Sequence, residues 1–407
     1  MSTKKEFDVI IWGASGFTGK LVCEYIFKKF RTNNELKWAM AGRDLSKLEL
    51  VRAEIADHTV PIVIAESNDI KSLDLMTQRT KVVCTTVGPY AKYGSKLVQS
   101  CIENRTHYCD LAGEVQWIRK MIDKYHEKAK RNTVKIVNSC GFDSIPSDLG
   151  VYYIQKESKQ KLNKRAKNID MRVAGIKGGI SGGTYASLSN VTKEAFKDKN
   201  IFKVITNPYG LNPINEQTGP DKNDLRKIVF DKVSKNWIGP FIMASINTKI
   251  VRRSNALMNY MYGKDFTYNE ATLSGEGFTG KIKAYTLVIP LVILMSAKPG
   301  SLLKKIVDFI LPKPGEGPNK KNRESGFYNL RFYVKLEDDS NAFAKVTGDM
   351  DPGYGSTSKM LAESAICLAK DKLPNSYGVL TPSSAMGDSI LKRLQSNAGL
   401  SFSFVTK

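Results

Sequence analysis

The stretch FDVIIWGASGFTGKLVCEYIFKKF, residues 7–30, joins a β-favouring run to a helical run through three glycines. Its first part is apolar and β-favouring, Gly13, Gly16 and Gly19 follow at once, and the last part carries apolar residues at helical spacing. Strand, glycine turn and helix in this order are the context that a dinucleotide-binding turn requires. The glycines let the backbone approach a pyrophosphate, and the helix N-terminus offers free N–H groups and a partial positive charge.

The same alternation of strand and helix continues over about the first 150 residues. Further strand-like runs lie at 36–41, 61–65, 81–86, 107–111 and 134–139. This spacing predicts an α/β fold with a Rossmann-type, doubly wound parallel sheet. Ligands of such sheets bind beyond the carboxyl ends of the strands. We therefore expect the ligand to meet the loops at 42–44, 87–94, 112–114 and 141–148.

The pattern changes after about residue 150. A glycine-rich stretch at 178–183 precedes short β-like runs such as Thr248–Arg252 and Phe327–Val334. These runs predict a second, α+β domain with an antiparallel sheet. Amphipathic helices are expected at 356–371 and 383–395, where the chain returns to cover the first domain. The predicted division is a dinucleotide-binding domain at 1–150, which the C-terminal helices cover, and a second domain that begins at 151.

Composition narrows the class of protein. The 407 residues are 42% hydrophobic and 25% charged, which is typical of a globular protein, and the formal net charge is +22. Such a charge suits a nucleotide phosphate, a membrane surface or nucleic acid, but a general bias toward Lys and Asn explains it equally well. No RRM, zinc finger or arginine-rich stretch is present in the sequence, so we expect no nucleic-acid partner.

The six scattered cysteines and three histidines show no C-x-x-C pair and no metal-ligand spacing. The sequence therefore predicts reduced thiols and no metal site. Because the chain starts with a basic, polar segment that runs directly into a strand, no secretory signal is visible and we expect a cytoplasmic protein.

One segment near residue 290 is almost wholly apolar. Ala284–Ala297 contains Pro290 and is too short to span a bilayer as a helix, and Ser301–Leu311 then sets apolar residues beside lysines in the pattern of an interfacial helix. Three interpretations stay open. The segment is a buried core element followed by a surface helix, a peripheral contact with a membrane or lipid-droplet surface, or a wall of an acyl-chain pocket or dimer contact.

The end of the second predicted strand carries the cofactor preference. A chain that prefers NAD usually presents an acidic residue to the ribose hydroxyls at this place, whereas this sequence reads Ala41-Gly42-Arg43-Asp44. Arginine offers a fixed fork of donors that suits a 2′-phosphate, so the sequence favours NADPH. The alternative is a turn in which Arg43 only pairs with Asp44.

Several residues in the loops could carry chemistry. Tyr90 and Tyr93 follow the fourth strand and could donate hydrogen bonds to a substrate carbonyl, or they could be packing residues. Asp143 follows the sixth strand and could orient a partner or cap the next helix.

A rival arrangement is the Ser…Tyr-x-x-x-Lys spacing of short-chain dehydrogenases. Ser139, Tyr152 and Lys156 match that spacing, in which the tyrosine is the general acid. So loose a pattern is easily met by chance in a chain with 17 tyrosines.

Longer motifs resemble a known family. They are GASGFTG at 13–19, TTVGPYAKYG at 85–94, CGFDSIPSDL at 140–149, KGGISGGT at 177–184, IVRRSNAL at 250–257 and DPGY at 351–354. Together they resemble the saccharopine dehydrogenase-like oxidoreductases, and GVLTPSSAMGD at 378–388 is most similar to the trans-acting enoyl reductase branch. The resemblance runs over nearly the whole chain.

The resemblance implies an NADP-binding Rossmann domain at 1–150, completed by 353–407, and a substrate and catalytic domain at 151–352. It also implies NADPH and reduction of an unsaturated acyl chain in lipid or glycolipid synthesis, for some members beside a polyketide synthase. An acyl or lipid-like substrate and an acyl carrier or synthase partner are expected from it, and a homodimer is left open. A saccharopine-type amino-acid dehydrogenase is one alternative. A non-catalytic dinucleotide-binding protein on lipid surfaces is the other, because a glycine turn reports binding rather than turnover.

Two sets of residues follow from this sequence analysis. The expected cofactor-binding residues are Gly13, Ser15, Gly16, Phe17, Thr18, Gly19, Arg43, Val87, Gly88 and Pro89. The catalytic candidates, without assigned roles, are Tyr90, Tyr93, Asp143, Lys177 and Tyr185.

Overall fold

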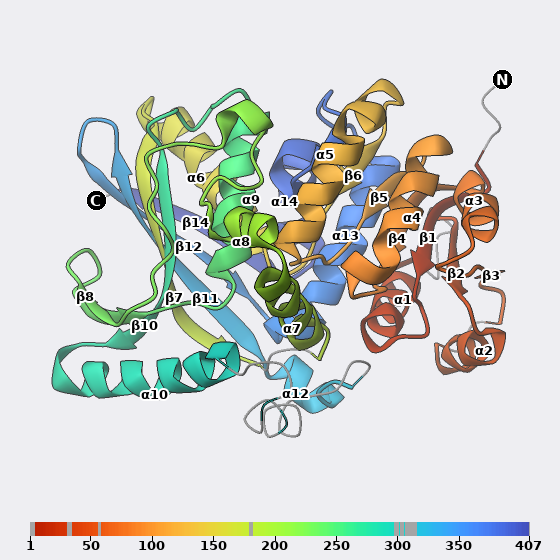
Figure 1. Ribbon diagram of the computed structural model, residues 1–407, viewed down its shortest axis with the longest axis horizontal. Coiled ribbons are helices and arrows are strands. Elements are labelled where there is room, and N and C mark those ends of the chain that lie inside the picture. The colour runs from red at the N-terminus through yellow and green to blue at the C-terminus, as the bar shows by residue number, and fades with distance from the viewer. Residues whose placement is uncertain are drawn as a thin grey trace.

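The computed structural model describes residues 5–30, 35–55, 58–178, 182–296, 301, 305 and 316–406. The described residues form two seven-stranded sheets, with helices between and around them (Figure 1).

The first sheet is parallel and has the order β13-β6-β5-β4-β1-β2-β3. Its strands from the first part of the chain are β1 (Phe7–Trp12), β2 (Trp38–Gly42), β3 (Ile62–Ile64), β4 (Thr80–Thr85), β5 (His107–Cys109) and β6 (Lys135–Val137). The helices between them are α1 (Phe17–Phe30), α2 (Leu45–Glu54), α3 (Ile70–Gln78), α4 (Tyr90–Glu103) and α5 (Val115–Arg131). All of β1 is buried, as expected for a parallel strand whose sheet is covered on both faces. The predicted Rossmann-type sheet is confirmed.

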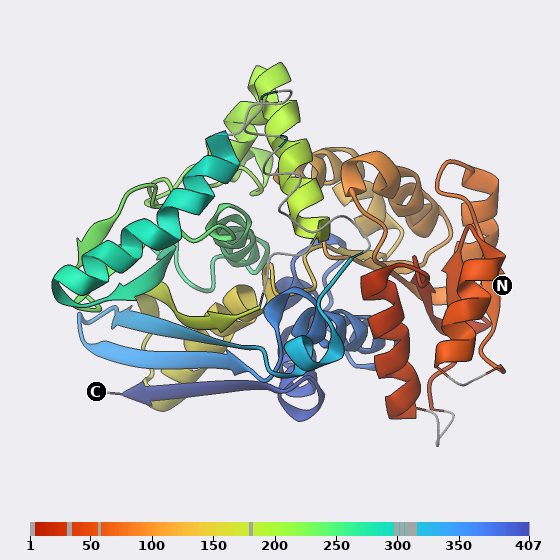
Figure 2. The same cartoon turned by 90° about the horizontal axis from the view of Figure 1, so that it is seen from below.

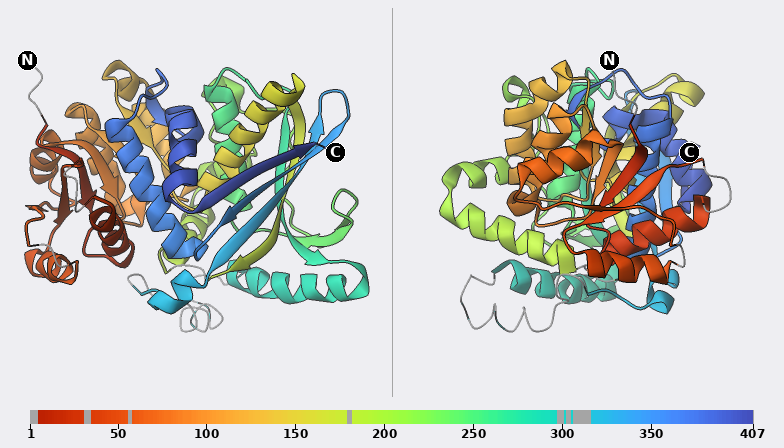
Figure 3. Two further views of the ribbon diagram at one scale, coloured as in Figure 1. Left: turned by 180° about the vertical axis from the view of Figure 1, so that it is seen from behind. Right: turned by 90° about the vertical axis from the view of Figure 1, so that its right-hand side faces the viewer.

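The C-terminal part of the chain contributes to both sheets. Helix α13 (Thr357–Lys370) packs against α1, β1 and β4, and β13 (Gly378–Leu380) pairs with β6 at the edge of the first sheet (Figure 3). After α14 (Pro382–Asn397), strand β14 (Leu400–Thr406) pairs instead with β12 of the second sheet. The two helices expected near the C-terminus are present, while the domain division given by the sequence stays a prediction.

The second sheet is mixed and has the order β14-β12-β11-β7-β10-β9-β8. Its other strands are β7 (Ala166–Lys177), β8 (Val229–Asp231), β9 (Asn236–Gly239), β10 (Thr267–Gly275), β11 (Phe327–Leu336) and β12 (Asn341–Gly348). Only the β7–β10 pair is parallel among the described strands of this sheet. In β11 every second residue is buried, so one face of the sheet forms a core and the other is more open.

The remaining helices link the sheets. They are α6 (Ile145–Leu162), α7 (Gly182–Lys197), α8 (Lys199–Thr206), η1 (Ile214–Glu216), α9 (Ala244–Leu257), α10 (Gly277–Ser296), α12 (Lys320–Glu324) and η2 (Pro352–Ser356). Helix α9 lies between the two sheets, where it packs against α6 and β10 (Figure 1).

The strand predicted at Thr248–Arg252 is wrong, because these residues lie inside α9. Their β-branched side chains favour a strand by propensity alone. Ile246 and Ile250, however, are four residues apart and share one helix face, and both are buried. Tertiary burial of that face therefore outweighs the local preference.

The apolar segment forms the second half of α10, a helix with Pro290 inside that runs along β9 and β10 (Figure 2). Ala284 and Val288 are buried. The exposed apolar residues of α10 are Phe278, Ile282, Tyr285, Leu287, Ile289 and Ile293. None of the described helices is long and apolar enough to cross a membrane. Of the predicted helix at Ser301–Leu311, all but Ser301 and Lys305 lie outside the described residues.

Candidate functional site

The glycine turn between β1 and α1 forms one end of a cleft. Gly13 has a φ of +89°, which favours glycine, and a Cβ there would lie 2.6 Å from Val87 Cγ2 and 2.9 Å from Thr86 Oγ1. A Cβ on Gly19 would overlap the carbonyl of Gly13, so α1 lies directly against the turn. The first turn of α1 contains no acidic residue, and Gly16, directly before this helix, lines the cleft. This end suits a phosphate group.

The loop after β4 completes the turn. Thr86 N donates to Trp12 O (3.0 Å) and Thr86 Oγ1 donates to Gly13 O (3.2 Å). Gly88 and Pro89 line the cleft beside Thr86. Of the predicted cofactor set, Gly16, Phe17, Thr18, Gly88 and Pro89 line the cleft, and Val87 packs on Gly13. The exposed Ser15 and the buried Gly19 lie in the same turn.

Arg43 is exposed directly after β2, at the carboxyl edge of the sheet. Its neighbour Asp44 caps α2, accepting a hydrogen bond from Lys47 N (3.1 Å), and pairs with the Lys47 side chain (3.7 Å). The Arg43 guanidinium makes no hydrogen bond or ion pair with a described residue. The alternative in which Arg43 only pairs with Asp44 is therefore not what the structure shows.

The cleft has a volume of about 720 Å³ and is lined by residues of both halves of the molecule. Its lining includes Leu111, Gly113 and Asp143, and also a largely apolar group of residues that we call the apolar arm. That apolar arm is lined by Val191, Ala195, Phe196, Phe202, Ile205, Leu225, Phe241, Ile242, Met243 and Val288. Most of these residues come from α7, α8 and the segment that leads into α9.

Asp143 lies in the loop between β6 and α6 and faces the cleft. A Cβ added to Gly113 would lie 3.7 Å from its Oδ2. Burial raises the pKa of the Asp143 carboxyl to about 7. No described residue donates a hydrogen bond to this carboxyl, and Ser144, not Asp143, occupies the N-cap position of α6. At neutral pH the group is thus poised between its acid and base forms.

Tyr90, by contrast, is held by its surroundings. Its hydroxyl donates to Thr85 O (3.3 Å) and accepts from Leu111 N (3.1 Å), and its ring is stacked on Trp117. Tyr90 therefore lines the cleft, but its hydroxyl is already hydrogen-bonded to backbone groups.

The other catalytic candidates lie off the cleft lining. Tyr93 is 38% exposed on α4, Lys177 is exposed at the end of β7, and Tyr185 lies on α7 beside Ala186, which does line the cleft. Their catalytic roles stay predictions.

The rival short-chain dehydrogenase arrangement is not assembled. Ser139 is buried and its hydroxyl donates to Ala112 O (2.6 Å). Tyr152 and Lys156 both donate to Asp388 on α14, at 3.2 and 2.7 Å, and neither lines the cleft.

A buried carboxylate joins the two walls. Glu114 accepts hydrogen bonds from Tyr90 N (2.6 Å) and Ala91 N (3.0 Å) at the start of α4, and from Ser187 Oγ (3.1 Å) on α7. A negative charge at a helix N-terminus is stabilising, so Glu114 fixes α4 and holds α7 against the first domain's loops.

Sequence reasoning missed the polar residues on the far wall. Lys249 on α9 lines the cleft, together with Asp224 and Arg226 from the loop before β8. The mistaken strand at 248–252 concealed Lys249, although the four-residue spacing of Ile246 and Ile250 would have revealed the helix face. Among the described residues no cluster of His, Cys, Asp or Glu is placed to hold a metal ion.

Comparison with known proteins gives consistent matches. Residues 9–137 match the family described as saccharopine dehydrogenase NADP binding domain. A Mycobacterium tuberculosis relative with a provisional name as a trans-acting enoyl reductase is 36% identical over 424 residues, with 98% of each chain covered. The trans-acting enoyl reductase of Mycobacterium leprae is 34% identical, covering 97% of this chain and 96% of its own.

A solved structure shows the same fold at low identity. The saccharopine dehydrogenase (L-Glu forming) of Saccharomyces cerevisiae is superposed with a TM-score of 0.53 at 12% identity, over 98% of this chain and 99% of that one. The matches together identify an NADP-dependent oxidoreductase whose cofactor is NADPH.

Proposed function

Because the chain belongs to the saccharopine dehydrogenase-like oxidoreductases, in the branch of the trans-acting enoyl reductases, we propose that it reduces the carbon–carbon double bond of an α,β-unsaturated acyl thioester. The observation that carries the proposal is one continuous cleft. Its lining includes residues of the glycine turn, Asp143 and the apolar arm, so a cofactor, an acid and an apolar chain can meet in one space.

The residues present fit NADPH. The backbone around Gly13 and Gly19 leaves no room for a Cβ, and the α1 N-terminus faces the cleft without a competing acid. The Arg43 guanidinium has no partner among the described residues and can meet a 2′-phosphate with charge-assisted hydrogen bonds. When bound, NADPH supplies the hydride for the β-carbon.

The apolar arm suits an acyl chain. Phe196 and Phe202 are 68% and 56% exposed in this arm, whereas Ile246, which also lines the cleft, is 2% exposed. An apolar ligand that enters this arm is removed from water, at about 25 cal/mol for each Å² of apolar surface buried. A polar amino-acid substrate would gain little from these side chains, which favours the acyl substrate over a saccharopine-type one.

Asp143 provides the proton in this proposal. Saturation of the double bond needs a proton at the α-carbon once hydride has reached the β-carbon. A carboxyl that lines the cleft, with a pKa of about 7 and no hydrogen-bond donor committed to it, holds such a proton near neutral pH. It gives up the proton, becomes a carboxylate and is reprotonated from solvent.

The test follows NADPH oxidation with α,β-unsaturated acyl thioesters of increasing chain length. Saturated thioesters of the same lengths are the control, and saccharopine with NADP tests the amino-acid alternative. We expect turnover only with the unsaturated thioesters, and more of it as the chain lengthens. Tight NADPH binding without turnover of any substrate would favour the non-catalytic alternative.

The relatives are named as trans-acting. We further propose that this chain also acts in trans, on an acyl chain presented by a carrier or synthase. The same unsaturated chain on an acyl carrier protein should then be reduced with a higher kcat/KM than on a small thiol. Equal values for the two substrates would contradict this.

The exposed face of α10 supports a peripheral contact with a lipid surface. Apolar side chains such as Ile282 and Ile289 are half exposed on this helix. In flotation with anionic liposomes, Ile282→Glu with Ile289→Glu should reduce the bound fraction. The matched control is Leu50→Glu with Leu75→Glu, two exposed leucines on α2 and α3. Equal flotation of both double variants would contradict the proposed lipid contact.

A further inference from the structure

Lys249 is a buried cation with unused hydrogen-bonding capacity. It lies on α9, is only 2% exposed, and lines the cleft. Its ammonium donates one hydrogen bond, to Ser245 O at 3.0 Å. Because a lysine ammonium has three N–H donors, two of them lack a partner among the described residues.

A second buried lysine shows that burial alone does not explain this. Lys135 is also 2% exposed, and burial lowers the pKa of both lysines to about 8. The Lys135 ammonium, however, donates to Pro374 O (2.7 Å) and to both the carbonyl and the hydroxyl of Ser376. Lys135 is thus fully satisfied within the fold, whereas Lys249 faces an open space.

The charges near Lys249 leave a positive excess. Asp224 is its nearby acid, and one Asp224 oxygen already accepts from Thr248 Oγ1 (2.9 Å). Arg226 lines the same wall, and Arg252 is paired with Asp221 at 2.5 Å. Two cations, Lys249 and the exposed Arg226, therefore lie near one carboxylate, that of Asp224, at the edge of the apolar arm. A buried cation is costly unless it is paired, so this wall favours an anionic ligand.

We propose that Lys249 and Arg226 form an anion subsite in the apolar arm, which binds a negatively charged oxygen group, either on the carrier of the acyl thioester or on the free fatty acid that its hydrolysis releases. The inference rests on the proposed function for the acyl nature of the ligand. Two sources have this chemistry, namely the carboxylate of a fatty acid and the phosphate of a phosphopantetheine arm. Both are oxyanions that accept charge-assisted hydrogen bonds from an ammonium and a guanidinium.

Direct binding tests the subsite without turnover and without NADPH. Calorimetry on the full chain compares two matched pairs of probes, decanoate with decanol and 4′-phosphopantetheine with pantetheine. Lys249→Met keeps the length of the side chain and removes its charge. We expect it to weaken at least one anionic probe by about tenfold or more, with the neutral partner within about twofold. The affected pair identifies the source of the anion.

Lys193→Met is the matched control. Lys193 is an exposed lysine on α7, a helix of which other residues line the cleft. The control variant should leave all four probes within about twofold, and Arg226→Gln should weaken the same anion as Lys249→Met. The inference is overturned if the parent protein binds neither anion better than its neutral partner, or if Lys249→Met and Lys193→Met behave alike. Failure of the proposed reduction would instead appear as absent NADPH oxidation, with anion binding intact.

Discussion

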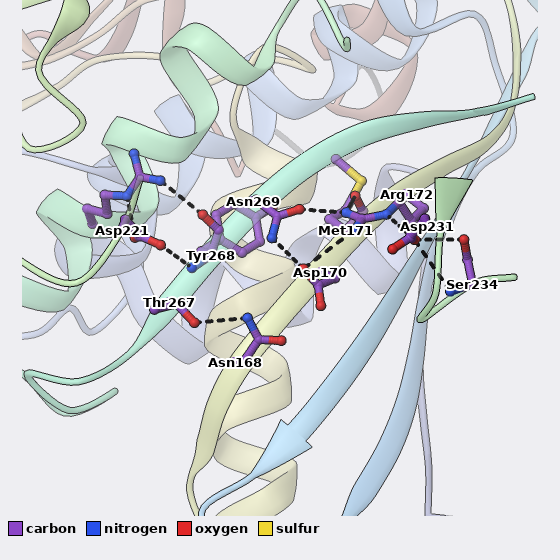
Figure 4. Close-up of polar contacts among 11 residues, drawn as sticks. Asn168, Asp170, Met171, Arg172, Asp221, Asp231, Ser234, Thr267, Tyr268 and Asn269 are labelled. Atoms are coloured by element: carbon purple, nitrogen blue, oxygen red, sulfur yellow. Dashed lines mark hydrogen bonds and ion pairs between the residues drawn. The ribbon is translucent and has the colours of Figure 1, made fainter. Parts of the chain in front are cut away.

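Two regions of the molecule contain charged side chains with very different partners. In the second sheet, Arg172 donates to Asp231 Oδ2 (2.9 Å), Asn269 Oδ1 (2.7 Å) and Met171 O (2.9 Å), and Asn269 donates to Asp170 (Figure 4). In the cleft, Asp143 has no described partner and Lys249 has one.

The pKa shifts follow the same division. Burial alone would raise the pKa of Asp231, but hydrogen bonds from Arg172 and Ser234 lower it below its ordinary value. Burial raises the pKa of Asp143 to about 7 because no such donor opposes it. Burial is thus common to both regions, and it is the absence of partners that marks the cleft as a place for ligands.

The largest effect is expected at Asp143. Asp143→Asn removes the proposed proton donor and should lower kcat by about 10² to 10⁴-fold, with NADPH affinity within a few-fold. The acid must be protonated to act, so activity of the parent should fall as the pH rises through about 7. Steady-state rates between pH 5 and 9 (roughly two units either side of that pKa) measure both.

Tyr152→Phe is the control for the rival arrangement, since Tyr152 binds Asp388 away from the cleft. Its activity should stay within about a few-fold of the parent. A collapse of activity in Tyr152→Phe with the fold intact, or a flat pH profile for the parent, would overturn the role given to Asp143.

The partnered network should respond in stability instead. Arg172→Met leaves Asp231 and Asp170 buried without their cation, which should cost about 3 to 5 kcal/mol in the free energy of unfolding. Denaturation by urea measures it. Arg172→Met with Asp231→Leu removes both charges and should recover part of the loss. A single variant as stable as the parent would show that the network is dispensable.

Arg43 should separate the two cofactors. Arg43→Ala removes the charge-assisted hydrogen bonds to a 2′-phosphate, worth roughly 1.5 to 3 kcal/mol, and should weaken NADPH by about 10-fold to 100-fold. NADH should change by no more than a few-fold. Titration of both cofactors into both proteins, by fluorescence or calorimetry, measures the difference. Equal losses would mean that Arg43 only holds the turn.

The smallest effect is expected for the stability of variants at the two buried lysines. Lys249→Met replaces a poorly partnered charge with an apolar chain and should change the free energy of unfolding by less than about 1 kcal/mol. Lys135→Met deprives several carbonyls and a hydroxyl of their donor and should cost about 1 to 3 kcal/mol. Thermal denaturation of both proteins checks the order. Equal costs would remove the distinction between a structural and an available lysine.

Much of the site's first half could be predicted from the sequence. The glycine turn, its flanking strand and helix, and Arg43 lie within one short stretch, so local pattern is enough to place them. The loop at 87–89 was located for a similar reason, because the carboxyl ends of parallel strands meet at one edge of a sheet.

The sequence alone therefore specifies the first six strands of the Rossmann sheet and the end of the cleft that fits NADPH, since short contiguous stretches encode each of them, whereas the edge strand β13 comes from the C-terminal part of the chain. Only the tertiary structure decided that Thr248–Arg252 is helical, that Tyr90 is held by backbone groups and that Asp143 is not. It also brought Lys249 into the lining of the same cleft as the glycine turn. Whether a buried charge has a partner depends on elements that are far apart in the chain, and a local sequence pattern does not show which of these elements lie close together in space.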